Sequence, residues 1–145
     1  MRMSDVLISA RGLTRRFGDV VAVNDVSLDI RAGETLALVG ESGSGKTTLG
    51  RMMALLLPPS EGELQINGRS AVGLRRRALK PVRRNVQMIF QDPVSSLNPR
   101  QTVANILMEP LRNYRLGDRD ERSARAAELL EAVGLPAETA QRYPH

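Results

Sequence analysis

The sequence predicts an α/β fold about one domain in size, with a helical last third. Three observations support this class. Short apolar segments of strand length alternate with helical segments up to residue 91. A glycine-rich loop at residues 40–47 separates an apolar segment from a helical one. Two long helical patterns then follow each other with no strand pattern between them, as expected for a helical subdomain.

The first forty residues predict strands. The apolar segments at 6–10 and 26–30 have strand length, and Asn24–Asp25 and Ala32–Gly33 supply turn residues around the second. The segment at 34–40, "ETLALVG", is nearly continuously apolar. It therefore predicts a strand that is buried on both faces and ends at Gly40.

The middle of the chain predicts a helix and two more strands. The helical pattern at 46–57 ends before Pro58, because proline cannot continue a helix. The alternating segment at 62–69 predicts a strand that turns at Asn67–Gly68. After an arginine-rich connector, the apolar segment at 86–90 predicts a further buried strand.

The last third predicts two helices, over 102–111 and 118–135. The second begins with Asp118 three residues before Glu121, which is the spacing of a capping box. Gly134 and the proline two residues later mark its end. Its apolar residues follow one helical stripe, formed by Ala126, Leu129, Leu130 and Val133.

The composition limits the classes of function. The formal charge of +5 comes from an arginine excess clustered at 75–77 and 83–84. No aromatic residues interleave with these arginines, which favours a solvated face or a patch near anionic lipid over a nucleic-acid surface. The absence of cysteine fits a reducing compartment. The first residues do not form a secretory signal, and the longest apolar run, 52–57, is too short to cross a bilayer.

The strongest motif is the loop from Gly40 to Thr47, "GESGSGKT", which matches the pattern G-x-x-x-x-G-K-S/T between a predicted strand and a predicted helix. Its glycines allow backbone N–H groups to converge on phosphate oxygens, at a helix N-terminus that also favours negative charge. The alternative is a glycine-rich turn with a solvent-exposed lysine. The agreement of motif and context favours a nucleoside triphosphate with Mg²⁺.

Each residue of this loop has an expected role. Lys46 reaches the β and γ phosphates, the Thr47 hydroxyl ligates Mg²⁺, and Thr48 adds a donor near the α phosphate. The residues expected to contact the nucleotide here are Gly40, Ser42, Gly43, Ser44, Gly45, Lys46, Thr47 and Thr48.

Hydrolysis needs more than a phosphate loop. A carboxylate at the end of a second buried strand normally holds the metal's water, and a further group orients the attacking water. Downstream of Lys46, only Asp92 follows an apolar strand pattern, and Gln91 separates it from that strand. The chemistry of the residues alone therefore does not identify a convincing metal-binding carboxylate or water-orienting group.

Together with the phosphate loop, "FQDP" at 90–93 and "RYPH" at 142–145 make the chain resemble the nucleotide-binding domain of ABC transporters. The longer "IFQDPVSSLNPR" is similar to the branch that imports oligopeptides, dipeptides and nickel. The resemblance implies a P-loop NTPase fold of the ABC type, with an N-terminal antiparallel β portion and P-loop core over 1–91. A helical subdomain would follow over 92–145, with the C-terminal part of the core sheet missing.

The resemblance implies two further site residues. Gln91 would be the Q-loop glutamine, which contacts Mg²⁺ or the attacking water and links the ATP site to the helical subdomain. Without the resemblance, a polar residue capping the turn before Pro93 is the simpler interpretation. Phe17 occupies the position of the aromatic residue that stacks on adenine. Its alternative role is a strand residue packed into the core.

The resemblance also implies a function. The chain would be an ATP-binding subunit of an ABC importer, coupling Mg-ATP hydrolysis to the uptake of peptides or a similar small solute. It would lie on the cytoplasmic face of the plasma membrane, with permease subunits, a second ATP-binding subunit and, indirectly, an extracytoplasmic solute-binding protein as partners. No nucleic acid is expected.

The sequence stops just before the position of the family's signature motif. The signature motif, the Walker B aspartate and the catalytic glutamate therefore have no counterpart here, so the 145 residues alone are expected to be inactive and marginally stable. Two alternatives stay open. One is a non-hydrolysing nucleotide-binding regulatory module, and the other is a soluble ABC-type ATPase that acts on nucleic acid.

Overall fold

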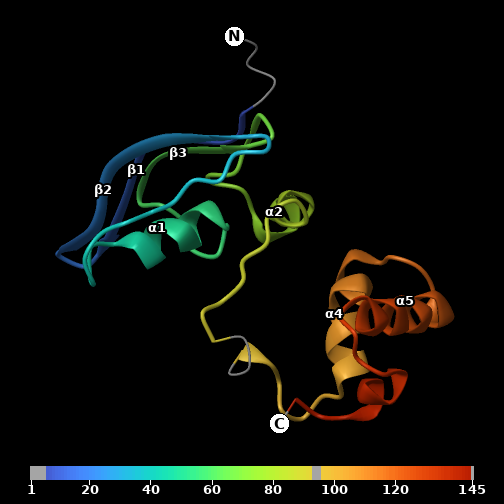
Figure 1. The fold of residues 1–145 in the computed structure, drawn as a ribbon. Helices are drawn as coiled ribbons and strands as arrows, with labels where there is room; N and C mark the ends of the chain where they lie inside the picture. The colour runs from blue at the N-terminus through green and yellow to red at the C-terminus, as the bar shows by residue number, and fades with distance from the viewer. Residues whose placement is uncertain (1–5, 93–95, 145) are drawn as a thin grey trace. The chain divides into compact units, whose positions relative to one another are not determined.

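The computed structural model describes residues 6–92 and 96–144, which form two compact units divided between Met88 and Ile89. The first unit contains an antiparallel sheet, with helices α1 (Lys46–Met53) and α2 (Arg76–Arg83) (Figure 1). The second unit is helical. Among the described residues, no helix is both long enough and apolar enough to cross a membrane.

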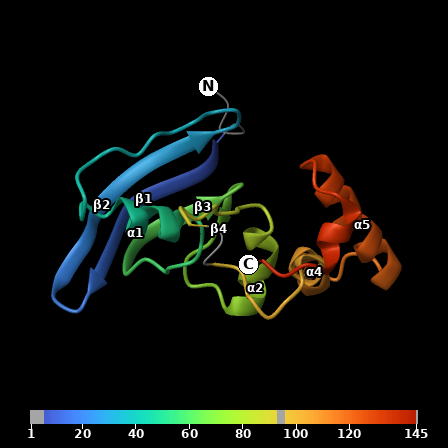
Figure 2. The ribbon, with the colours of Figure 1, turned by 60° about the horizontal axis from the view of Figure 1, so that its bottom comes forward.

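The sheet has four strands in the order β2-β1-β3-β4, and its neighbouring strands pair antiparallel. Its longest part is the hairpin of β1 (Val6–Phe17) and β2 (Val20–Arg31), visible in Figures 1 and 2. β3 (Glu61–Ile66) pairs with the other edge of β1, and β4 (Arg69–Ser70) follows β3 through a tight turn. Arg11 on β1 forms an ion pair with Asp29 on β2, which lowers the pKa of the Asp29 carboxyl.

The predicted turn at Asn67–Gly68 is confirmed, and both residues have positive φ, 50° and 71°, as a type I′ turn requires. The expected turn at Asn24–Asp25 is wrong, because both residues lie inside β2. Here the register shifts between Leu13↔Val26 and Arg15↔Val23, so β2 has one more residue than β1 between these pairs. Asp25 has a φ of 51° and donates its N–H to the Thr14 hydroxyl.

The core of the first unit lies between the sheet and α1. Ala10 and Leu13 from β1, Leu64 from β3 and Met52 from α1 are almost fully buried. α1 presents Leu49 and Met52, three residues apart and therefore on one helical face, to the sheet. Packing against the sheet thus fixes the direction in which the N-terminus of α1 points.

α1 is shorter than the pattern at 46–57 predicts. It ends at Met53, and Leu55 takes a left-handed φ of 60°. Leu55 N–H then donates to Met52 O, and Leu56 N–H donates to Arg51 O, which is the hydrogen-bond pattern of a Schellman motif. The backbone therefore leaves the helix before the proline is reached, although apolar residues continue.

Neither 34–40 nor 86–90 is a strand, so both predictions of buried strands are wrong at the level of secondary structure. In each segment large apolar side chains are exposed, most of all Val39 and Ile89, both 90% exposed. A strand needs a partner for its backbone N–H and C=O groups, and no described strand pairs with either segment. An apolar sequence pattern reports a tendency to be buried, but it does not supply that partner.

The arginine-rich connector contains the helix α2, which the sequence did not predict. Pro81 lies inside α2 and removes one backbone donor. Val82 is buried, and Arg83 donates two hydrogen bonds to Leu55 O, at 2.8 and 3.2 Å. These contacts join α2 to the turn after α1.

The second unit contains α4 (Val103–Tyr114), α5 (Arg119–Ala132) and the 3-10 helix η2 (Ala137–Gln141). The predicted capping box of α5 is confirmed. Asp118 Oδ1 accepts hydrogen bonds from the N–H groups of Asp120 and Glu121, and the Glu121 side chain accepts one from Asp118 N–H.

The predicted stop of α5 is also confirmed, since Gly134 takes a φ of 72° just after the helix. Its expected apolar stripe is only partly buried. Ala126 and Leu130 are buried, whereas Val133 is 70% exposed and lies outside the core of this unit. Val133 is the C-cap residue, where the chain is already leaving the helix.

Candidate functional site

The glycine-rich loop ends at Gly45, which is the N-cap of α1 and has a φ of 90°. A Cβ atom at this position would lie 2.2 Å from the carbonyl oxygen of Ala22 on β2. Only glycine allows this close approach of two backbones. Gly43 also has a positive φ, 83°, but it faces open space. Gly45 therefore allows the loop to pack against the sheet, whereas Gly43 allows only the turn of the backbone within the loop.

The N-terminus of α1 offers unpaired backbone donors. Leu49 N–H is the first to donate into the helix, to Gly45 O at 2.9 Å. The N–H groups of Lys46, Thr47 and Thr48 therefore have no acceptor within the helix. The loop residues Ser42, Gly43 and Ser44 are exposed, as is Thr47, while Thr48 is half-buried. A bound anion at this point would receive these N–H groups and the favourable end of the helix dipole.

The Lys46 side chain folds back over the loop. Its ammonium group donates to Gly40 O at 2.7 Å, to Glu41 O and to the Ser44 hydroxyl at 3.3 Å. A Cβ atom at Gly40 would lie 2.9 Å from the Ser44 hydroxyl oxygen, so a side chain at this position would displace that hydroxyl. Carbonyl and hydroxyl oxygens thus hold a positive charge at the mouth of the loop.

A cavity of about 410 Å³ lies between this loop and the start of β2. Ser44, Gly45 and Lys46 line one side, and Val21 to Asn24 line another. The exposed apolar residues Leu38 and Val39 complete part of the wall. The cavity therefore brings the cationic loop next to the β2 backbone.

Phe17 ends β1, and it pairs with Val20 across the hairpin turn. Its side chain is 47% exposed, which argues against the interpretation as a core residue. The carbon at the centre of the Arg15 guanidinium lies 4.7 Å from the centre of the Phe17 ring. The sequence reasoning missed Arg15, although a spacing of two residues on a strand places both side chains on one face.

Gln91 lies in the second unit, at an exposed bend after the segment 86–90, and the neighbouring Asp92 is exposed too. The predicted site residues are therefore divided. The loop residues and Phe17 belong to the first unit, and Gln91 belongs to the second. The described part of the chain contains no group of three or more acidic, histidine or cysteine side chains that could hold a metal ion.

The phosphate loop fits a magnesium ion only if a nucleotide is bound. The Thr47 hydroxyl oxygen is a ligand of the kind that Mg²⁺ accepts, but Mg²⁺ normally takes several ligands from substrate phosphates and water. The ion would arrive with the phosphates and not before them.

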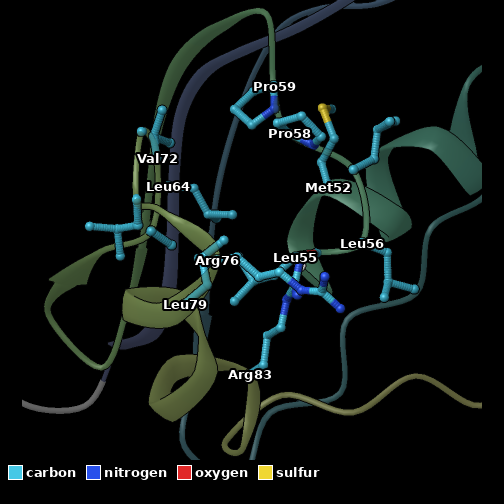
Figure 3. Close-up of a pocket in the computed structure, with 14 residues that line it drawn as sticks. Met52, Leu55, Leu56, Pro58, Pro59, Leu64, Val72, Arg76, Leu79 and Arg83 are labelled. Carbon is cyan, nitrogen blue, oxygen red and sulfur yellow. Dashed lines mark hydrogen bonds between the residues drawn. The ribbon is translucent and has the colours of Figure 1, made fainter.

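A second cavity, of about 640 Å³, lies in the same unit between the turn after α1, β3 and α2 (Figure 3). Its walls are mostly apolar and include Met52, Leu64 and Leu79. Arg76 and Arg83 also line it, and they are seven residues apart on one face of α2. Pro58 and Pro59 close one side, as labelled in Figure 3.

The chain is similar to known proteins over most of its length. A family model described as ABC transporter matches residues 23–145. The chain is 47% identical over 150 residues to the glutathione import ATP-binding protein GsiA of Salmonella typhimurium, which covers 96% of this chain and 24% of that protein. It is 48% identical over 149 residues to the oligopeptide transport ATP-binding protein OppF of Bacillus subtilis, covering 99% of this chain and 49% of the relative. The chain thus spans a quarter to a half of the length of these relatives.

The fold is also similar to solved structures. One is a dimeric ATP-binding cassette in a post-hydrolysis state with bound ADP and phosphate, at a TM-score of 0.79 and 28% identity. The match covers 95% of this chain and 62% of that one. A nucleotide-free cassette from an ABC transporter, 21% identical, has a TM-score of 0.73, which supports the fold alone. The arrangement of loop, helix and antiparallel sheet is therefore that of an ABC-type P-loop NTPase.

Proposed function

This chain belongs to the ABC transporter family, and from that premise we propose that it binds Mg-ATP as part of the ATP-binding subunit of an importer for peptides or a similar small solute. One observation carries the proposal. The Lys46 ammonium and the free N–H groups at the start of α1 lie together at the end of a loop whose residues 41–44 are exposed. The names of the two bacterial relatives, a glutathione importer component and an oligopeptide transport component, support the solute class.

The binding step follows from the loop's chemistry. Lys46 exchanges its bonds to Gly40 O and Glu41 O for phosphate oxygens, which are charged acceptors and hold an ammonium group more strongly than carbonyls do. The N–H groups of Lys46, Thr47 and Thr48 receive the remaining oxygens. Gly40, Ser42, Gly43, Ser44 and Gly45 shape the loop around them.

The residues that we propose for hydrolysis belong to both units of the chain. Mg²⁺ would neutralise charge on the phosphates, with the Thr47 hydroxyl and the Gln91 amide as protein ligands. Gln91 would also orient the attacking water, and Phe17 would contact the adenine base. We propose residues 1–91 as the nucleotide-binding portion and 92–145 as the helical subdomain.

The partners and the cellular location are part of the same proposal. Transmembrane permease subunits, a second ATP-binding subunit and, through the permease, a solute-binding protein would complete the transporter. The protein would lie on the cytoplasmic face of the membrane. The dimeric assembly of the similar cassette supports the pairing of two ATP-binding subunits.

The first test is calorimetric titration of the chain with Mg-ATP, comparing Lys46→Ala with the unsubstituted chain. We expect Lys46→Ala to weaken binding by at least about tenfold, because it removes a charge-assisted hydrogen bond to phosphate. Lys80→Ala is the matched control, since Lys80 is the only other lysine and lies on α2.

Two results would contradict the proposal. One is equal affinity for Mg-ATP in the Lys46→Ala and Lys80→Ala variants, and the other is the absence of binding by the unsubstituted chain. Steeply salt-dependent binding of DNA or RNA would favour an ATPase that acts on nucleic acid. Mg-ATP binding by a stable monomer with a cooperative unfolding transition would favour a regulatory module, because the importer fragment is expected to be marginally stable.

A further inference from the structure

We propose that Arg15 is a positioning residue for the nucleotide base: it covers one face of the Phe17 ring and holds the ring so that the other face receives the base. This inference deepens the proposed function and rests on it. It adds a residue that acts through Phe17 and makes no contact with phosphate.

The guanidinium of Arg15 is held at two points. Its central carbon lies 4.7 Å from the Phe17 ring centre, within the range of a cation–π contact. Its Nη1 donates to Pro58 O at 2.9 Å. Its Nε is buried and has no hydrogen-bond partner. Burying a polar group without a partner costs free energy. The contact with the ring and the hydrogen bond to the Pro58 carbonyl therefore have to offset this cost.

Pro58 is an exposed residue whose carbonyl accepts the hydrogen bond from Arg15. It belongs to the turn after α1 and lines the same cavity as Met52, as labelled in Figure 3. The same turn receives two hydrogen bonds from Arg83 on α2 to Leu55 O. A guanidinium that donates to the Pro58 carbonyl has to break this hydrogen bond to follow the ring if the ring rotates, so Arg15 restricts the ring.

Phe17 is close enough to the loop for a base to reach it. Phe17 pairs with Val20, and Ala22, two residues further along β2, has its carbonyl oxygen against Gly45. Two residues of strand span about 7 Å. The half-exposed ring therefore lies at the end of the hairpin that is next to the part of β2 in contact with the phosphate loop.

The arrangement favours base binding for two reasons. A ring that is already held in place loses less conformational freedom when a base stacks on it. The cation on the covered face leaves only one face available, which sets the orientation of the base. A cation–π contact of this kind changes an equilibrium constant by about two- to fivefold, whereas loss of the stacking ring itself changes affinity by about five- to hundredfold.

The test compares two ligands on the same chain, Mg-ATP and Mg-tripolyphosphate, which lacks the base. We expect Arg15→Gln to weaken Mg-ATP binding about two- to fivefold and to leave tripolyphosphate binding unchanged. Arg15→Lys, which keeps the charge, should restore part of the affinity. Arg16→Gln is the matched control, because Arg16 is the exposed neighbour and its side chain bonds to Glu61.

A double-mutant cycle separates positioning from simple charge. In a Phe17→Ala background, Arg15→Gln should have no further effect on Mg-ATP affinity, because the ring through which it acts is gone. An equal effect of Arg15→Gln with and without Phe17 would overturn the inference. So would an equal loss of ATP and tripolyphosphate affinity, which would mean that Arg15 acts on the phosphates.

The two proposals can fail separately. If Mg-ATP binds and Lys46→Ala abolishes binding but Arg15→Gln has no effect, the inference is wrong and the proposed function stands. If the unsubstituted chain binds neither ligand, both are wrong.

A second measurement guards against misfolding of the Arg15 variant. The chain contains no tryptophan, so Phe17→Trp introduces a single fluorophore at the ring position. Mg-ATP should quench it and tripolyphosphate should not, and Arg15→Gln should reduce the quench. Quenching of equal size by both ligands would overturn the inference.

Discussion

At the scale of single residues, Gly45 is the position where the phosphate loop tolerates the least change. Its φ of 90° is unfavourable for any residue with a side chain, and the carbonyl of Ala22 occupies the space that a Cβ would need. Gly43 has the same kind of backbone conformation without the neighbour. Substitutions at the two glycines can therefore be compared: both introduce backbone strain, but only the one at Gly45 also introduces a clash with Ala22.

We predict that Gly45→Ala destabilises the chain more than Gly43→Ala does. Gly43→Ala should cost about 1–2 kcal/mol through its φ alone. Gly45→Ala should cost about 1–3 kcal/mol more, because the Ala22 backbone has to move. Urea denaturation of both variants gives the difference in the free energy of unfolding. Equal losses would mean that the contact with Ala22 relaxes freely.

The sequence predicts some of the candidate site at this scale and misses other parts for physical reasons. The loop residues could be predicted from a motif, because they lie close together in the sequence. The spacing of Arg15 and Phe17 places them on one strand face, but it does not reveal the hydrogen bond of Arg15 to Pro58, 43 residues away. The roles of Gln91 and Phe17 come from a family resemblance and stay predictions, because neither has a local pattern that reports nucleotide contact.

At the scale of elements, α4 and α5 end in related ways with different residues. α5 is followed by Gly134 in the left-handed conformation, whereas after α4 the same conformation is taken by Arg115, with a φ of 56°. Leu116 N–H donates to Leu111 O, which completes a Schellman pattern. Arg115 is exposed, and its left-handed φ is strained for a residue with a side chain.

We predict that Arg115→Gly stabilises the second unit by about 0.5–1 kcal/mol, because glycine adopts this φ without strain. Asn113→Gly, two residues earlier and inside α4, should instead destabilise it by less than about 0.5 kcal/mol. Chemical denaturation of the two variants followed by circular dichroism would test the contrast. A loss of stability in Arg115→Gly would show that the arginine side chain makes a favourable contact in solution.

The sequence predicts those elements whose stability is local. The Asn67–Gly68 turn and the Asp118 capping box each depend on residues within three positions, and both are confirmed. The predicted strands at 34–40 and 86–90 depend on partners distant in the sequence, and they are wrong in this structure. α2 was missed because its charged composition and internal Pro81 resemble a linker.

At the scale of the whole molecule, the apolar surface is distributed unevenly. Leu36, Leu38 and Val39 are exposed in the segment before the phosphate loop, and Ile89 and Phe90 are exposed in the segment before Gln91. Meanwhile β1 is paired on both sides, by β2 and β3. Protection of the backbone from solvent should therefore differ sharply between β1 and these segments.

We predict that the amides of 34–40 exchange with deuterium at least about tenfold faster than those of β1, because no described strand pairs with this segment. Exchange measured by mass spectrometry on peptides covering 6–17 and 34–40 would test this. Equal protection of the two would mean that 34–40 is paired in solution. Adding Mg-ATP should slow exchange at residues 41–48 and leave the peptide 6–17 unchanged.

The hydrogen bonds at the turn after α1 determine how this turn responds to ionic strength. Arg15 and Arg83 both donate to backbone carbonyls there, at Pro58 and Leu55, and a carbonyl carries no net charge. The exposed pair of Arg16 with Glu61, by contrast, joins two opposite charges that dissolved ions screen. The turn that anchors Arg15 should therefore keep its geometry in molar salt, where the surface ion pairs of the same sheet have lost most of their attraction.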